Sequence, residues 1–117
     1  MATLGFMYGT GKGVRKDQAE AVRWYRKAVN AGSATGMTDL GVMYRDGTGI
    51  GKDEAEAVRW FRKAADAGSP AGMTRLGGMY ESGRGVGKDM TEAVRWYSKA
   101  AAAGDEDGKT ALSRLRK

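Results

Sequence analysis

The chain repeats itself every 36 residues, and this period limits what it can fold into more than any other feature of the sequence. The pattern Met-x-x-Leu-Gly-x-Met-Tyr begins at Met1, Met37 and Met73, and Ala-Val-Arg-Trp recurs with the same spacing. The three copies align without a gap and agree at 19 of their 36 positions. They are residues 1–36, 37–72 and 73–108. A fixed period of this length is the signature of an architecture built from stacked, similar units.

Each copy is expected to form two antiparallel helices. In the middle copy, Ser33 precedes apolar residues at helical spacing as far as Tyr44, and Gly47 is suited to end that helix. Asp53, with a glutamate three residues later, resembles a capping box and opens the second helix, which Gly68 ends. The equivalent residues elsewhere are the caps Asp17, Asp89 and Asp105 and the stops Gly11, Gly32, Gly83 and Gly104.

The sequence has no alternating strand pattern, and one helix pair of this size cannot bury its apolar side alone. Stacked pairs can, so residues 1–117 are expected to form one all-α solenoid domain. Residues 109–117 begin a fourth copy and are expected to end the stack with a polar capping helix. Glycine in the middle of a helix costs about 1 kcal/mol relative to alanine. Its recurrence at Gly5, Gly41 and Gly77 therefore predicts that an aromatic side chain of a neighbouring helix approaches the backbone there.

Catalysis and cofactor binding are not expected. The chain has no cysteine and no histidine, which removes the common nucleophile, general-base and transition-metal ligands. The loop from Gly47 to Lys52 is rich in glycine, but its spacing and the following Asp53 do not fit a phosphate-binding loop. We therefore expect no enzyme activity, no cofactor and no metal site. No secretory signal or membrane-spanning segment is evident either, and the cellular compartment stays open.

The net charge of +6 raises the question of a polyanionic partner. The first copy and residues 109–117 each carry +4, whereas the second and third copies each carry −1. Within each copy, a glutamate lies three residues before an arginine of the second helix, which is typical of local ion pairs on a solvated surface. This distribution argues against nucleic acid as the partner. A basic solenoid that binds nucleic acid or another polyanion remains the alternative to a protein-binding one.

The packing positions of the repeat resemble those of a known family. The residues that match the tetratricopeptide consensus are Leu40, Gly41, Tyr44, Ala57, Phe61 and Ala64. The longer loop Gly-x-Gly-(Val/Ile)-x-Lys-Asp and the motif Trp-(Tyr/Phe)-x-Lys-Ala are similar to the Sel-one-like repeat, a relative of the tetratricopeptide repeat. The resemblance implies a right-handed α-superhelix that acts as an adaptor or scaffold for protein complexes, often in bacteria. It also implies that the first helix of each pair lines a concave groove.

The groove positions predict where a partner binds. They differ from copy to copy while the packing positions stay fixed, as expected if recognition rather than folding selects them. The candidate partner-binding residues are Phe6, Thr38, Asp39, Val42, Arg45, Thr74, Arg75, Gly78 and Glu81. The alternative, that these are unconstrained surface positions, is equally open. Because the residues that should precede the first helix are missing, we expect a piece of a longer array whose N-terminal end can self-associate through Met1, Leu4 and Tyr8.

Overall fold

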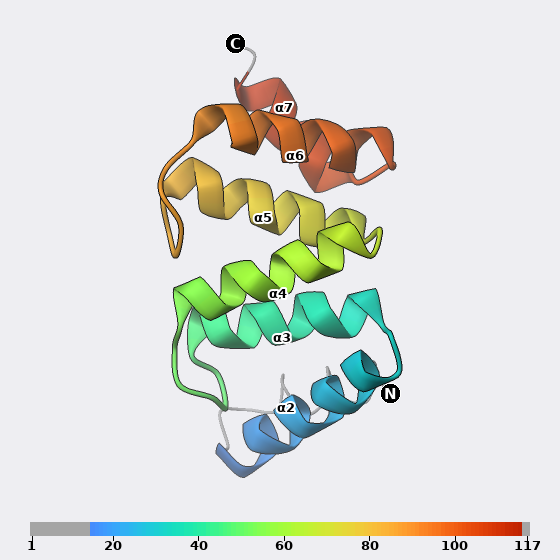
Figure 1. Ribbon diagram of the computed structural model, residues 1–117, viewed down its shortest axis with the longest axis vertical. Coiled ribbons are helices and arrows are strands. Elements are labelled where there is room, and N and C mark those ends of the chain that lie inside the picture. The colour runs from blue at the N-terminus through green and yellow to red at the C-terminus, as the bar shows by residue number, and fades with distance from the viewer. Residues whose placement is uncertain (1–14, 116–117) are drawn as a thin grey trace.

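The computed structural model describes residues 15–115, and this part of the chain folds into six α-helices and no strand. The helices are α2 (Arg15–Asn30), α3 (Ala34–Asp46), α4 (Glu54–Asp66), α5 (Pro70–Ser82), α6 (Met90–Ala102) and α7 (Glu106–Leu115). Figure 1 shows them stacked along the long axis of the molecule, from α2 at one end to α7 at the other. The expected all-α repeat solenoid is confirmed.

The predicted helix boundaries are mostly correct, and the same contacts recur in successive copies. The hydroxyl of Ser33 accepts the N–H of Gly36 at 3.0 Å, and the carboxylate of Asp53 accepts the N–H of Glu56 at 3.0 Å. Gly47 ends α3 in the left-handed region with φ of 72°. The glutamate of the expected capping box is used differently, because Glu56 forms an ion pair with Arg59.

One predicted cap is wrong. Helix α2 begins at Arg15, so Asp17 lies inside its first turn instead of preceding the helix. The equivalents of Arg15 are Gly51 and Gly87, both of which lie in the loop before the second helix of their copies. Arginine favours the helix by close to 1 kcal/mol relative to glycine, so the first copy can begin its helix earlier. The expected stop at Gly11 lies outside the described residues.

Each copy buries its apolar residues against the next. Leu40, Phe61 and Leu76 are fully buried, and Trp96 is only 6% exposed. Trp60 of α4 packs on the cluster formed by α2 and α3, and Trp96 of α6 belongs to the cluster formed by α4 and α5. Both indole rings therefore pack in the apolar interior between copies, with Trp96 buried and Trp60 partly buried. The free energy of this stack comes from contacts between neighbouring repeats.

The predicted close approach of an aromatic side chain to the mid-helix glycines is confirmed at Gly41 and Gly77. A Cβ atom on Gly41 would lie 2.6 Å from a ring carbon of Phe61, and one on Gly77 would lie 2.9 Å from the ring of Tyr97. In both copies the second helix crosses directly over the backbone of the first. The approaching aromatic residue comes from the column of Tyr25, Phe61 and Tyr97, not from the tryptophan column.

The two helices of each copy occupy different sides of the stack. We call α3, α5 and α7 the A helices and α2, α4 and α6 the B helices. Helix α3 contacts α5, and α5 contacts α7, whereas the Cα atoms of different B helices are nowhere within 8 Å of one another. Among the described helices, successive A helices therefore lie closer together than successive B helices. This is the arrangement of a solenoid that curves toward its A helices.

Candidate functional site

The A helices present a continuous surface whose residues change from copy to copy. We call it the A-helix face. It consists of Asp39, Val42 and Arg45 on α3, Arg75, Gly78 and Glu81 on α5, and Arg114 on α7. Residues 36 apart occupy equivalent places on successive helices, so α3 and α5 bring six of the nine predicted site residues to one side of the molecule.

Thr38 and Thr74 have a different role from the one predicted. Thr38 is only 4% exposed, and its hydroxyl lies 3.2 Å from that of Ser69, the cap of α5. In the next copy, the hydroxyl of Thr74 donates to a carboxylate oxygen of Asp105 at 2.6 Å. These threonines therefore join consecutive A helices. The expectation that Thr38 faces a partner is not met, because its polar group is already used in packing.

The remaining predicted site residue, Phe6, lies outside the described residues. So do Met1, Leu4 and Tyr8, on which the expected self-association depends. The surface can therefore be followed from α3 to α7.

At the C-terminal part of the A-helix face, Glu81 is held by two neighbours. Its carboxylate accepts two hydrogen bonds from the guanidinium of Arg114, at 2.7 and 2.8 Å, and one from the hydroxyl of Tyr97 at 2.7 Å. The hydrogen bonds from Arg114, and to a lesser extent the one from Tyr97, lower the pKa of Glu81. Partial burial of the carboxylate acts in the opposite direction but has a smaller effect on the pKa than the bonds from Arg114. Burial and the same carboxylate raise the pKa of Tyr97. The network joins α5, α6 and α7. It satisfies the charge of Glu81 within the chain.

A second charge on this face is also satisfied within the chain. The guanidinium of Arg45 donates to both carboxylate oxygens of Asp46, at 2.9 and 3.2 Å. This bond is the main reason why the pKa of Asp46 lies below its ordinary value. Arg45 is therefore folded back onto its own helix.

Asp39 and Arg75 are in a different situation. They occupy the same column on α3 and α5, yet they form neither an ion pair nor a side-chain hydrogen bond with any residue that the structure describes. Asp39 is partly buried and Arg75 is exposed. Burial raises the pKa of Asp39 to about 6, although the positive charge of Arg75 acts in the opposite direction. From α2, the group that faces Asp39 is Tyr25, whose own pKa is raised to about 12 by burial and by the Asp39 charge.

Sequence reasoning missed Arg114 as part of this face and assigned it to the polar cap. The signal that identifies it is its position 36 residues after Gly78, in the column that also holds Val42. The missing side chain at Gly78 leaves room above Tyr97, whose hydroxyl would lie 3.6 Å from a Cβ atom there.

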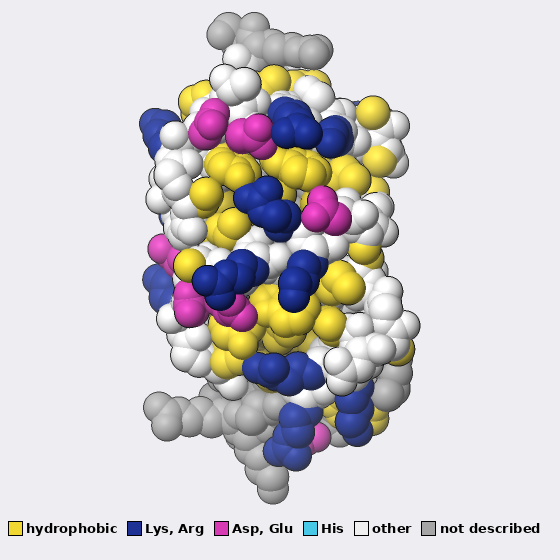
Figure 2. Space-filling view, viewed as in Figure 1, with side chains coloured by type: hydrophobic (Ala, Val, Ile, Leu, Met, Phe, Trp, Pro, Cys, Tyr) yellow, Lys and Arg dark blue, Asp and Glu magenta, His cyan; other side chains and the backbone are white. Residues whose placement is uncertain are grey.

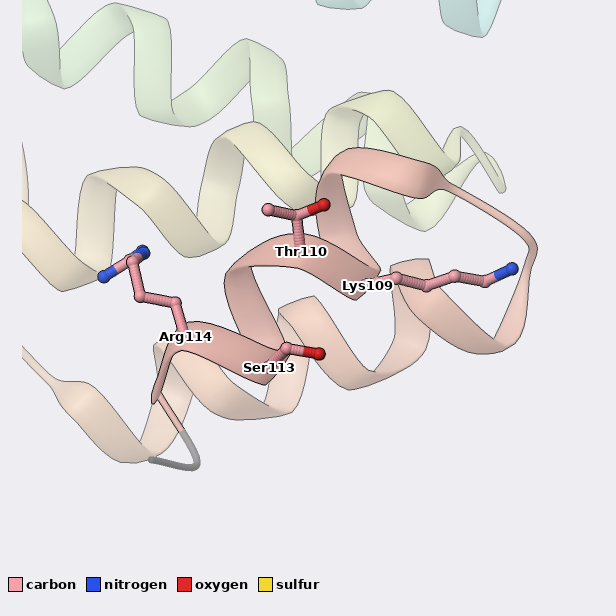
Figure 3. Close-up of a pocket in the computed structure, with 4 residues that line it drawn as sticks. All are labelled: Lys109, Thr110, Ser113 and Arg114. Carbon is pink, nitrogen blue, oxygen red and sulfur yellow. The ribbon is translucent and has the colours of Figure 1, made fainter.

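Helix α7 also lines a shallow open depression of about 490 Å³. Figure 3 shows Lys109, Thr110, Ser113 and Arg114 around it. Lys109 and Ser113 stand where α5 has Met73 and Gly77, the residues that pack in the apolar interior. The surface is consequently polar and exposed, without the buried convergent groups of a ligand site.

The B helices carry most of the basic side chains, and Figure 2 shows Lys and Arg side chains along the viewed face from α2 to α6, with apolar side chains between them. Arg23, Arg59 and Arg95 pair with the glutamates three residues before them. The ammonium groups of Lys27, Lys63 and Lys99 lie 4.6–4.7 Å from the ring centres of Trp24, Trp60 and Trp96. The predicted local ion pairs are confirmed.

Neither a metal centre nor a membrane span emerges from the described residues. No cluster of acidic side chains among them could hold a metal ion. The described helices are also too short or too polar to cross a bilayer.

The repeated helix pairs and their recurring contacts define a helical repeat scaffold. Comparison with known protein families identifies the type of repeat. The Sel1 repeat matches residues 1–33, 34–69 and 70–105. The chain belongs to the Sel1 repeat family, whose members are commonly protein-interaction modules. This confirms the resemblance found in the sequence. No curated protein matches the chain significantly in sequence.

Three solved structures show the same fold. A Sel1 repeat protein from Oxalobacter formigenes is 41% identical, with a TM-score of 0.84 over 95% of this chain and 45% of its own. A protective antigen of uropathogenic Escherichia coli strains with an SLR fold is 46% identical, with a TM-score of 0.79 over 88% of this chain and 22% of its own. Helicobacter pylori cysteine-rich protein B is 30% identical, with a TM-score of 0.75 over 80% of this chain and 70% of its own. The chain thus spans less than half of the first two.

Proposed function

We propose that this chain is a non-enzymatic adaptor module that binds a peptide or an extended protein segment along the A-helix face. The observation that carries the proposal is the contrast between two sets of columns. The packing columns, such as Leu40 and Leu76, are the same in each copy, whereas the columns of the A-helix face change in charge and size. Packing requires a residue of similar size and polarity in each repeat, as in the column of Tyr25, Phe61 and Tyr97, and recognition does not.

The experiment selects ligands from a library of random short peptides displayed on phage and measures their affinity by fluorescence polarisation. We expect Val42→Arg to weaken binding by at least roughly tenfold, because it places a long charged side chain in the middle of the face. Val42 is partly buried against the apolar cluster of α4 and α5, so thermal denaturation must show that the variant is folded. Arg59→Ala on the B-helix side is the matched control and should leave the affinity unchanged. Equal losses from both variants, or no selected peptide at all, would refute the proposal.

The alternative is binding of nucleic acid or another polyanion through the basic B-helix side. Its support is the row of lysines and arginines from α2 to α6, but three of those arginines already pair with glutamates. Retention on heparin or duplex DNA that falls steeply with salt would favour it, since polyanion binding releases counterions. Binding that depends on Val42 and changes little with salt would favour the A-helix face.

A further inference from the structure

The charges of the A-helix face fall into two groups. Arg45 is bonded to Asp46, and Glu81 is bonded to Arg114 and Tyr97. Asp39 and Arg75 lie on the same two adjacent helices, six residues before Arg45 and Glu81 respectively, and have no ion-pair partner within the described region. An unpaired charge at a partly buried position is costly unless a partner satisfies it.

We propose that Asp39 and Arg75 form the charged recognition pair of this face, and that they take a peptide segment presenting a cationic side chain to Asp39 and an acidic side chain to Arg75. The inference rests on the proposed function and specifies the chemistry of its ligand. The occupant is a peptide because the two receptors carry opposite charges on successive helices, and two side chains of one peptide can serve both.

Charge complementarity supports this assignment. Arg75 is exposed and presents a planar guanidinium that can hold a carboxylate with two parallel hydrogen bonds. Asp39 is partly buried and accepts no hydrogen bond from a described side chain, so a lysine or arginine of a ligand would supply the missing donor. Neither receptor has to break an ion pair with a residue of the described part of the chain, whereas a ligand at Glu81 would have to displace Arg114.

The titration of Asp39 adds an independent readout. Among residues 15–115, the groups facing it are Tyr25 from α2 and Arg75 from α5, and Arg45 on its own helix is already bonded to Asp46. Because its pKa is raised to about 6, Asp39 is partly protonated in mildly acidic solution. A cationic ligand group binds the ionised carboxylate, so the affinity should fall as the pH drops through about 6.

The test compares peptides selected by the wild-type chain with those selected by the double variant Asp39→Arg/Arg75→Asp. Wild-type ligands should share one Lys or Arg and one Asp or Glu at a fixed separation, and the double variant should select the reversed order. For a wild-type peptide, each single change, Asp39→Arg or Arg75→Asp, should weaken binding by roughly tenfold or more. Asp39→Asn should abolish the pH dependence, and thermal denaturation verifies that each variant is folded.

The outcomes separate this inference from the proposed function. Peptides that lose affinity with Val42→Arg but share no charge pattern, or that bind the charge-reversed variant equally well, would refute the recognition pair and leave the proposed function standing. Failure to obtain any peptide sensitive to Val42→Arg would overturn both.

Discussion

At the residue scale, two neighbouring glycines of α5, Gly77 and Gly78, differ in how much room a side chain would have. A Cβ atom on Gly77 would lie 2.9 Å from the ring of Tyr97 and 3.2 Å from the carbonyl oxygen of Ala93. One on Gly78 would meet only the hydroxyl of Tyr97, at 3.6 Å, an ordinary contact. Both residues lie inside the same helix, so alanine improves the helix propensity equally at both positions.

The pair provides a test of close packing. We expect Gly77→Ala to lower the free energy of unfolding by about 1–3 kcal/mol, because the second helix must move away from the first. Gly78→Ala should raise it by up to about 1 kcal/mol through helix propensity. Urea denaturation measures both values. Similar effects of the two substitutions would show that the aromatic ring does not set the helix distance.

Asp39 gives a prediction about stability and pH. Its pKa is about 6 in the folded chain and 3.8 in its unperturbed state, so the folded state binds more protons between these values and loses stability as the pH rises. Asp39→Asn should therefore raise the free energy of unfolding at neutral pH by about 1 kcal/mol, discounted for partial exposure. Below about pH 4 the variant and wild type should be equally stable. A difference that does not vary with pH would refute the raised pKa.

The close packing at the mid-helix glycines could be predicted from the sequence, whereas the role of Thr38 could not. Glycine lowers helix stability, yet it recurs in the middle of the first predicted helix of every copy. The close approach of a neighbouring helix to Gly41 and Gly77 was therefore predictable from the pattern of a single helix. The role of Thr38 depends on Ser69, which lies 31 residues further on and reaches it only when two copies stack. Helical spacing placed Thr38 on the surface of its own helix, but it could not show that the next A helix covers it.

At the element scale, α7 is attached to the stack by an apolar cluster and by polar bonds near both of its ends. Leu112, which follows Leu40 and Leu76 at intervals of 36 residues, is buried with Tyr97, and Arg114 holds Glu81 of α5. The N-terminal end of α7 is joined to Thr74 through Asp105, which also caps the helix. The helix therefore has polar attachments to α5 near both of its ends.

We expect Arg114→Ala to loosen α7 selectively. Its backbone amides should exchange with solvent several-fold faster, while those of α3 and α4 keep their protection. Hydrogen exchange measured by mass spectrometry tests this. Lys109→Ala, which removes only an exposed pair with Glu106 at 3.5 Å, is the matched control. Unchanged exchange in α7 after the loss of Arg114 would show that the apolar cluster around Leu112 and the Thr74–Asp105 bond hold the helix without it.

The boundaries of the helices were predictable wherever the copies agree. Ser33, Asp53 and Gly47 act as expected because capping is a local interaction between residues a few positions apart. The start of α2 was not predicted, because the comparison between copies assumed that equivalent positions behave alike. Arg15 stands where the other copies have a glycine, and its higher helix propensity favours the earlier start.

At the scale of the whole molecule, every contact between described helices joins elements of the same or adjacent copies. The apolar interior is correspondingly divided into clusters, one around Leu40, one around Phe61 and Leu76, and one around Leu112. The free energy of such a stack is approximately a sum of local terms.

This division predicts how substitutions combine. Val22→Ala and Leu112→Ala lie in separate clusters, so their effects on the free energy of unfolding should add within about 0.5 kcal/mol. Val58→Ala and Met79→Ala share one cluster and should deviate from additivity by about 0.5 kcal/mol or more. Urea denaturation of the single and double variants measures both sums. Strong coupling between Val22 and Leu112 would contradict a stack of neighbour-only contacts.

The recurring bond from a threonine of one A helix to the cap of the next has a consequence for how such a gene can change. Thr38 reaches Ser69 and Thr74 reaches Asp105, so a similar pair of contact surfaces recurs in two successive intervals of 36 codons. A recombination event that duplicates or deletes one such interval would join surfaces that already fit, and folding would survive it. An event of any other length would leave a donor facing the wrong partner. Array length is therefore free to vary in inheritance, but only in whole repeats.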